Sequence, residues 1–357
     1  MAATGGGAGE PQGEDALAGP ALDRRGRPLR DLRLSVTDRC NFRCTYCMPR
    51  EVFGVDHAFL PREQILSYEE LARLTRVFAR LGVTKIRLTG GEPLLRRDLV
   101  TLVRAVATTP GITDVAMTTN GSLLARHASA LAAAGLTRVT VSLDSLDPST
   151  FRAMADTAVP LRAVLDGIAA ARDAGLGPVK LNAVVRRGRN DAGLLDLVAY
   201  ARDGGHILRF IEYMDVGSTN GWQGAEVVPA AELVERVGSS YPLEPLAPRQ
   251  IGETARRWRF LDGRGEIGVV ASVTSPFCTD CSRARVTAAG ELFTCLFATT
   301  GTDLRAVLRA GPVAEADAEL ERVLRAVWAG RTDRYSELRA SGVLAGAPRP
   351  EMSYVGG

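Results

Sequence analysis

The sequence predicts an α/β fold built on a mostly parallel sheet. Segments rich in β-branched residues alternate with helical segments from about Leu32 onward, and the connections between them are short. This alternation is typical of βα units, whose parallel strands need a crossover between them. The length of 357 residues suits one large α/β domain with a smaller partner. The sheet can curl into a partial or full barrel or lie open, and in both cases ligands bind at the carboxyl ends of the strands.

The first helix has the clearest boundaries. Ser67 can cap its N-terminus with Glu70 three residues later, and Gly82 stops it. Gly135 and Gly175 end two later helices in the same way. The expected strands cover residues 32–37, 84–89, 113–119, 138–143, 179–185 and 207–214, and the expected helices cover residues 67–81, 97–106, 123–134, 160–174 and 192–202.

The regular alternation is expected to stop near Asn220. Pro242, Pro245 and Pro248 indicate a connecting segment, and two short strands at 257–261 and 266–272 follow it. Between these strands the stretch Gly-Arg-Gly-Glu-Ile-Gly matches the dinucleotide pattern G-x-G-x-x-G, but no helix opens after it, so we interpret it as a hairpin turn. We expect three parts: a flexible tail at 1–25, a barrel core at 26–243 and a C-terminal domain at 244–357.

Composition excludes several functional classes. A net charge of +3 is too small to predict nucleic-acid binding. The first twenty residues lack a basic segment followed by an apolar run, so we expect no signal peptide and no membrane span. A cytoplasmic location follows as an expectation, and disulfides are rare in that reducing compartment. Metal binding becomes the more plausible use of the six cysteines.

Cys40, Cys44 and Cys47 form a closely spaced group of thiols. Thiolates bind soft metals, and this spacing places all three on one small loop. His57 is not an obvious fourth ligand, so the pattern favours a [4Fe-4S] cluster held by three cysteines with one iron open. A structural zinc loop, a disulfide with a spare thiol, and three buried thiols stay open as alternatives from spacing alone.

The remaining cysteines, Cys278, Cys281 and Cys295, form a second group. A zinc ribbon would need a fourth ligand, and no histidine follows His206, so a second three-cysteine cluster fits better. Arg283 and Arg285 lie within the gap before Cys295. Two guanidinium groups beside an open iron suit a substrate with a phosphate and a metal-coordinating ring nitrogen, although they could also be two surface arginines.

Basic residues on the expected strands indicate an anionic substrate. Only Lys85 and Lys180 of the 44 basic residues are lysine. Both fall on inner strands and should point at one ligand-binding face, and an interior lysine is costly unless it is paired or binds an anion. Gly90-Gly91 at the end of the second strand allows a close backbone approach. Asn120 and Asp144 can be explained in part as turn or cap residues.

The first cysteine group, with Tyr46 before its last cysteine, and the sequence Gly90-Gly91-Glu92-Pro93 resemble the radical S-adenosylmethionine (SAM) superfamily. The resemblance implies that the open iron binds the amino and carboxylate groups of SAM. An electron from the cluster then splits the sulfonium and yields a 5′-deoxyadenosyl radical. By the same resemblance, the SAM-binding residues are Tyr46, Gly91, Ser142 and Met214, with Tyr46 and Met214 against the adenine.

The two cysteine groups, the sequence Cys281-Ser282-Arg283-Ala284-Arg285 and the terminal Gly356-Gly357 together resemble the radical SAM GTP cyclases that open molybdenum cofactor biosynthesis. The resemblance implies an incomplete (βα)6 TIM-like barrel with a smaller C-terminal domain that carries the second cluster. It implies removal of hydrogen from the ribose C3′ of GTP and attack of that carbon on C8, with the Gly-Gly tail reaching the active site.

The same resemblance also implies cofactors, partners and residue roles. The cofactors are two [4Fe-4S] clusters and SAM. The protein should form a homodimer and hand its product over to the enzyme that makes cyclic pyranopterin monophosphate, and the electron donor is unknown. A radical SAM peptide maturase and a zinc- or cluster-stabilised interaction protein are the alternatives. The implied catalytic residues are Cys40, Cys44, Cys47, Arg283 and Arg285, and the implied GTP contacts are Arg33, Arg87, Thr118, Lys180, Arg283, Ala284 and Arg285, with Lys85 and Arg209 added by their positions.

Overall fold

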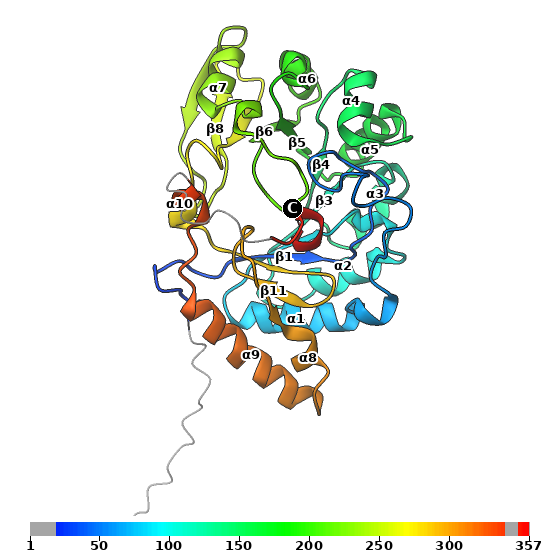
Figure 1. The fold of residues 1–357 in the computed structure, drawn as a ribbon, viewed down its shortest axis with the longest axis vertical. Helices are drawn as coiled ribbons and strands as arrows, with labels where there is room; N and C mark the ends of the chain where they lie inside the picture. Colours follow the sequence, from blue (N-terminus) through cyan, green and yellow to red (C-terminus); the bar gives the residue numbers. More distant parts are fainter. Residues whose placement is uncertain (1–18, 340–348, 357) are drawn as a thin grey trace, which may run out of the picture.

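The computed structural model describes residues 19–339 and 349–356. Within these residues, twelve strands form one sheet in the order β12-β11-β10-β1-β2-β3-β4-β5-β6-β9-β8-β7. The six central strands run parallel in chain order, and the ends of the sheet do not meet, which confirms the expected partial barrel (Figure 1). These strands are β1 (Asp31–Ser35), β2 (Lys85–Thr89), β3 (Asp114–Thr119), β4 (Arg138–Ser142), β5 (Lys180–Val185) and β6 (Ile207–Glu212).

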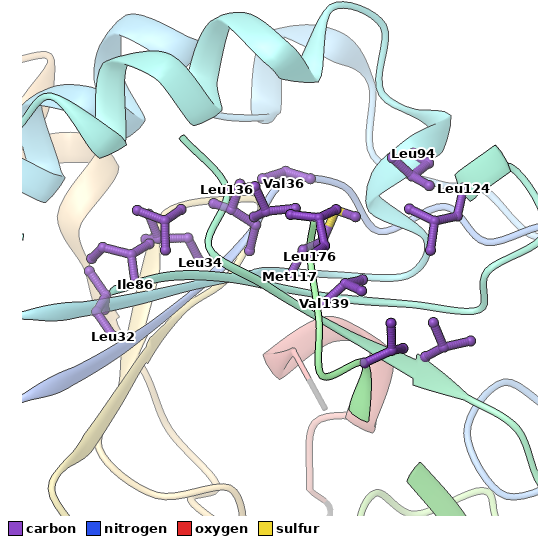
Figure 2. Packing of buried hydrophobic residues seen from close by; sticks show 14 of the residues in the cluster. Leu32, Leu34, Val36, Ile86, Leu94, Met117, Leu124, Leu136, Val139 and Leu176 are labelled. Atoms are coloured by element: carbon purple, nitrogen blue, oxygen red, sulfur yellow. The ribbon is translucent and has the colours of Figure 1, made fainter. Parts of the chain in front are cut away.

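Helices cover the outer face of these strands and bury its apolar side chains. Leu32, Leu34, Ile86 and Val139 are fully buried between sheet and helices (Figure 2). Because side chains alternate along a strand, the residues between them face the interior of the barrel. The helices are α1 (Tyr68–Arg80), α2 (Leu99–Ala107), α3 (Leu124–Ala133), α4 (Pro148–Ala155), α5 (Leu161–Asp173) and α6 (Leu194–Asp203).

The predicted capping box of α1 is present. The Ser67 hydroxyl accepts a hydrogen bond from the Glu70 backbone N–H, and the Glu70 carboxylate accepts one from the Ser67 N–H over 2.7 Å. Gly82 follows with a φ of +100°, a left-handed conformation that glycine adopts without strain. Local chemistry therefore sets both ends of this helix.

The second half departs from the expected pattern. The alternation continues past Asn220, because α7 (Ala230–Gly238) follows β6 and β9 (Glu266–Val270) runs parallel beside it. The expected connecting segment contains β7 (Leu243–Leu246), and Pro245 is tolerated there because β7 is an edge strand. The predicted hairpin is confirmed: β8 (Arg256–Phe260) pairs antiparallel with β9.

The opposite edge is built from residues that follow the second cysteine group. Here β10 (Arg283–Val286) runs parallel beside β1, and β11 (Glu291–Phe293) and β12 (Thr302–Asp303) follow it antiparallel. Helix α8 (Leu304–Leu308) precedes α9 (Val313–Gly330), which lies along α1 with an ion pair between Arg73 and Asp317. The short helix α11 (Met352–Val355) lies inside the curve of the sheet, and α10 (Tyr335–Leu338) lies at its border (Figure 1).

Single-turn 3-10 helices occur in the loops. They are η1 (Arg62–Gln64), η2 (Pro93–Leu95), η3 (Asp191–Gly193), η4 (Gly224–Glu226) and η5 (Cys278–Asp280). In the described part of the chain, none of the helices combines the length and apolar character needed to cross a bilayer.

Candidate active site

Three arginines lie side by side on the inner face of the barrel. Arg33 on β1 is in register with Arg87 on β2 and with Arg285 on β10. Like charges directly opposite one another destabilise a sheet unless something compensates them. Burial, and then the neighbouring guanidinium groups, hold the pKa of Arg33 well below its usual range, and burial lowers the pKa of Arg87 and of Arg285 to about 10. A bound anion would compensate the charges of these three arginines.

The two lysines also face the interior, but at the opposite end of the strands from the cysteine loop. Lys85 is the first residue of β2 and Lys180 the first of β5, close to where the expected strands at 84–89 and 179–185 placed them. Lys85 forms an ion pair of 2.8 Å with Asp31. Burial, together with the charge of Arg209, lowers the pKa of Lys180 to about 6. A cavity at this end is lined by cationic side chains and two carboxylates: Arg33, Lys85, Arg87, Arg138, Arg209, Arg249, Arg283, Asp31 and Glu253.

A larger cavity adjoins this basic one and shares Arg33, Arg87 and Arg283 with it. The second cysteine group faces it directly, from η5 and from the residue pair that follows β11. The structure thereby brings together most of the predicted site. The predicted residues that line this cavity are Arg33, Tyr46, Arg87, Thr118, Ser142, Arg209, Met214, Cys278, Cys281, Arg283, Arg285 and Cys295.

Other predicted residues, including Lys180 and the three cysteines of the first group, line neither cavity. The Ala284 side chain is fully buried in the apolar core behind β10, so a ligand could meet only its backbone. A Cβ atom on Gly91 would overlap the carbonyl oxygen of Arg39, and one on Gly90 would overlap that of Thr37. The Gly-Gly pair therefore lets the end of β2 pack directly against the loop that carries the first cysteines.

The first cysteine group lies on the loop after β1. Backbone bonds from Arg43 to Ala155 and from Thr45 to Met154 join this loop to the end of α4. Burial raises the pKa of the Cys40 thiol to about 11 and that of Cys47 to about 12. These values favour the protonated thiol until a metal displaces the proton.

Three buried carboxylates at strand ends hold the loops of the site, and the sequence reasoning assigned them no such role. Glu92 accepts hydrogen bonds from Leu94, Thr119 and Asn120, and burial raises its pKa to about 7. Glu212 accepts bonds from backbone groups of the loops that follow it, including the N–H of Val273 over 2.7 Å. The sequence signal for these carboxylates was an acidic residue at or just after the end of a buried strand. A turn or helix-cap role explains such a residue equally well, so the signal was not specific.

The third carboxylate, Asp144, orients Tyr46. The Tyr46 hydroxyl donates to Asp144 over 2.8 Å, and the Val184 N–H donates to the other carboxylate oxygen over 2.9 Å. Burial raises the pKa of Asp144 to about 6 and that of Tyr46 well above its usual range. Tyr46 is thus fixed at the wall of the larger cavity with Ser142 and Met214.

We expect Tyr46→Phe to lower the apparent free energy of unfolding by about 1–3 kcal/mol, because it leaves a buried carboxylate oxygen without its donor. Urea denaturation followed by circular dichroism measures the change. Tyr68→Phe is the matched control, since the Tyr68 hydroxyl donates to the Arg97 carbonyl in an exposed setting and its loss should cost less. Equal destabilisation by the two variants would contradict the positioning of Tyr46 by Asp144.

The electrostatic setting of the second cysteine group differs from that of the first. Burial raises the pKa of the Cys295 thiol to about 11. Burial acts in the same direction on Cys281, but Arg283 and Arg331 outweigh it and lower the pKa of this thiol to about 6. Arg283 also donates to the Cys281 sulfur over 3.4 Å. One thiolate of this group is therefore stabilised before any metal binds.

The C-terminal segment joins the two halves of the site. The Ser353 backbone N–H contacts the Cys47 sulfur, and the Arg285 guanidinium donates to the carbonyl oxygens of Val355 and Gly356. A Cβ atom on Gly356 would lie 2.6 Å from the Thr89 methyl group, and its φ is +73°, so glycine is required here. Gly357 lies outside the described residues.

Both cysteine groups fit iron–sulfur clusters by their chemistry. All six cysteines are free. Among residues 19–339 and 349–356, no three His, Cys, Asp or Glu side chains converge as a single metal ion would require. A cubane cluster binds each thiolate at a different iron, so its ligands need not converge on one point. The all-thiol donor sets therefore suit clusters better than a zinc ion with mixed ligands.

A partial parallel barrel with three thiols after its first strand and a Gly-Gly pair after its second defines a radical SAM enzyme. The family model "Radical SAM superfamily" matches residues 34–201, and the model "Molybdenum Cofactor Synthesis C" matches residues 206–337. The fold resembles the crystal structure of Streptococcus suis SuiB bound to S-adenosylmethionine, with a TM-score of 0.59 and 15% identity over 88% of this chain and 68% of that one.

Proteins of similar sequence identify the family within this superfamily. GTP 3′,8-cyclase of Acidothermus cellulolyticus is 56% identical and covers 95% of this chain and 99% of its own length. The protein of the same name from Xanthomonas axonopodis pv. citri is 52% identical over 96% of this chain and 100% of its own length, and that from Staphylococcus aureus is 43% identical over 94% and 98%. The chain belongs to the GTP 3′,8-cyclase family.

Proposed function

We propose that this chain converts GTP to (8S)-3′,8-cyclo-7,8-dihydroguanosine 5′-triphosphate, the first step of molybdenum cofactor biosynthesis. The observation that carries the proposal is the in-register row of Arg33, Arg87 and Arg285, which opens on one side to the second cysteine group and on the other to the basic cavity. A nucleoside triphosphate matches this arrangement, because it has a metal-coordinating base at one end and several negative charges at the other.

The two cofactor groups have separate places. When bound, the first [4Fe-4S] cluster and SAM would supply a 5′-deoxyadenosyl radical, the reactive species needed for loss of the hydrogen at the ribose C3′ of GTP. Cys40, Cys44 and Cys47 would hold this cluster, and Cys278, Cys281 and Cys295 would hold the second. Tyr46 and Met214 would contact the adenine of SAM, Gly91 its amino group through the backbone, and Ser142 a polar group of SAM.

The remaining residues of the site bind and orient GTP. Arg33, Arg87 and Lys180 would neutralise the triphosphate, with Lys85 and Arg209 beside them. Arg283 and Arg285 would contact the nucleotide next to the second cluster, Ala284 through its backbone and Thr118 from β3. Buried ion pairs of this type are strong because water does not screen them. A peptide substrate, as in the maturase alternative, would leave the row of arginines without a counter-charge.

GTP binding should be accompanied by proton uptake. Lys180 is largely neutral in the free protein above about pH 6, because its pKa is lowered to about 6. A triphosphate raises that pKa, so the amine gains a proton on binding. We expect titration calorimetry at about pH 7.5 to give a binding heat that depends on the ionisation enthalpy of the buffer, and the dependence should fade below about pH 5. Lys180→Met should remove most of it. A heat independent of buffer would show that Lys180 does not change protonation.

The test of the function is an anaerobic incubation of reconstituted protein with GTP, SAM and a reductant. We expect 5′-deoxyadenosine and the cyclised nucleotide, identified by mass spectrometry. ATP in place of GTP is the control for the base. Formation of 5′-deoxyadenosine with an added peptide but not with GTP would favour the maturase alternative, and zinc in place of iron would favour the interaction protein.

We also propose that the product is handed over to the enzyme that makes cyclic pyranopterin monophosphate, that the protein forms a homodimer, and that residues 26–243 form the core and residues 244–357 the C-terminal domain. The expected tail at 1–25 ends earlier, because Leu22 pairs with Pro28 and the Asp23 side chain is buried. A cytoplasmic location is supported by six free cysteines, which a reducing compartment keeps available for clusters.

A further inference from the structure

A buried group of charges lies behind the second cysteine group and takes no part in the function proposed above. Asp23 lies between Arg27 and Arg331: the Arg27 Nε is 2.6 Å from the Asp23 carboxylate, and the Arg331 Nη1 is 3.4 Å from it. The three side chains are 0%, 2% and 1% exposed in that order. We call them the Asp23 triad. Charges this deeply buried are rare unless they are paired and hydrogen-bonded.

The triad contacts the backbone of two cysteines of the second group. The Arg27 guanidinium donates to the Cys278 carbonyl over 2.7 Å, and the Arg331 guanidinium donates to the Cys281 carbonyl, also over 2.7 Å. Arg27 precedes β1, whereas Arg331 follows α9, so two distant segments converge on this one loop. Because Asp23 joins both arginines, it fixes the position of one cysteine relative to the other. Partners of this kind orient metal ligands and tune the metal in known sites.

The charge balance of the triad also indicates that it acts on the second cluster. Two guanidinium groups and one carboxylate leave an excess of one positive charge in a fully buried place. Asp333 contacts Arg331 over 3.2 Å, but its side chain is 29% exposed and water weakens its effect. The Arg27 Nη2 atom is buried without a hydrogen-bond partner among the described residues. A cluster with three thiolate ligands carries net negative charge and would supply the missing compensation.

In the described part of the chain, no arginine from outside the cysteine loop donates to a backbone carbonyl of Cys40, Cys44 or Cys47. Arg43 donates to the Cys40 carbonyl over 2.7 Å, but it is partly buried and belongs to the cysteine loop itself. The two cluster sites therefore differ in the positive charge that surrounds them. Reduction adds a negative charge to a cluster, so nearby positive charge makes reduction easier.

We propose that the Asp23 triad positions and tunes the second cluster: it holds the Cys278 and Cys281 carbonyls, and its excess positive charge raises the reduction potential of that cluster. The inference rests on the second cluster of the proposed function but not on the identity of the nucleotide. Its test contains neither GTP nor SAM, so failure of the cyclase reaction and failure of this inference are distinguishable.

The experiment uses the full chain with Cys40, Cys44 and Cys47 replaced by serine, so that the second cluster alone is titrated. We expect Arg331→Gln to shift its midpoint potential, measured by an electron-paramagnetic-resonance redox titration, to more negative values. Arg331→Lys keeps the charge and should keep the parent potential. Arg80→Gln is the matched control, because Arg80 forms an exposed ion pair with Glu321 between α1 and α9, away from the cysteines.

If a variant does not keep the second cluster, no potential can be measured, and the iron content of the protein becomes the readout. Loss of iron from Arg331→Gln but not from Arg331→Lys would support the proposal, provided that circular dichroism shows the fold to be intact. An unchanged potential in Arg331→Gln would overturn it. Equal shifts in the Gln and Lys variants, or loss of iron from both, would also overturn it, since a retained charge should retain the cluster and its potential.

Discussion

Replacing Cys278, Cys281 and Cys295 with serine should abolish formation of the cyclised nucleotide while the protein still cleaves SAM. The wild-type protein should contain about eight irons per chain, and this variant about four, because each cubane cluster has four irons. The first loop is tied to α4, the Gly-Gly pair and Glu92, none of which depends on the second group. Iron analysis and quantification of 5′-deoxyadenosine measure the two effects.

The converse variant, with Cys40, Cys44 and Cys47 replaced by serine, completes this comparison. It should keep about four irons and form neither 5′-deoxyadenosine nor the cyclised nucleotide. Loss of both clusters from both variants would mean that the two sites form as one unit. Unchanged iron in the first variant would show that the second group holds no cluster.

Arg285→Ala and Lys180→Ala should each lower kcat/KM for GTP by about 10²-fold or more while leaving SAM binding intact. Truncating one partner of a buried charge pair costs about 2–5 kcal/mol, and 1.4 kcal/mol is a factor of ten. Arg285 is 4% exposed and Lys180 is 7% exposed, so solvent cannot replace either charge. Steady-state kinetics with GTP and equilibrium binding of SAM separate the two effects.

Arg285 has a second partner that makes its variant informative. It donates to the carbonyls of Val355 and Gly356, so Arg285→Ala should also release the C-terminal segment from β10. Lys180 has no such role, and its variant should affect GTP alone. Arg322→Ala serves as the control for charge, because Arg322 is exposed and pairs only locally with Glu319. Equal losses of GTP and SAM binding would show that these residues are wrongly placed.

Much of the barrel could be predicted because local sequence determines it. The strands from β1 to β6 are short apolar segments bounded by turn residues, and α1 has both of its caps in the sequence. Their parallel order follows from the βα alternation. The cysteine groups were found for a similar reason, since the two spacings are local and the chemistry of thiols is specific.

The parts that were wrong depend on contacts between distant segments. No local signal shows that β10 inserts beside β1, yet this pairing brings Arg285 next to Arg33. Pro245 indicated a connection because a proline disrupts a central strand, whereas β7 is an edge strand.

The Asp23 triad illustrates the same limit at the level of side chains. Asp23 and Arg27 lie four residues apart near the expected tail, and Arg331 lies about three hundred residues later. In a chain so rich in arginine, none of them stands out. Only the fold shows that they meet behind Cys278 and Cys281.

We expect both cysteine groups to serve one reaction on GTP. The most direct test uses GTP that carries deuterium at C3′ of the ribose, incubated with the reconstituted protein, SAM and a reductant under anaerobic conditions. We expect deuterium in the 5′-deoxyadenosine and the cyclised nucleotide without deuterium at that carbon. Deuterium-free 5′-deoxyadenosine, or its formation at the same rate without GTP, would show that the radical does not remove hydrogen from C3′ of GTP.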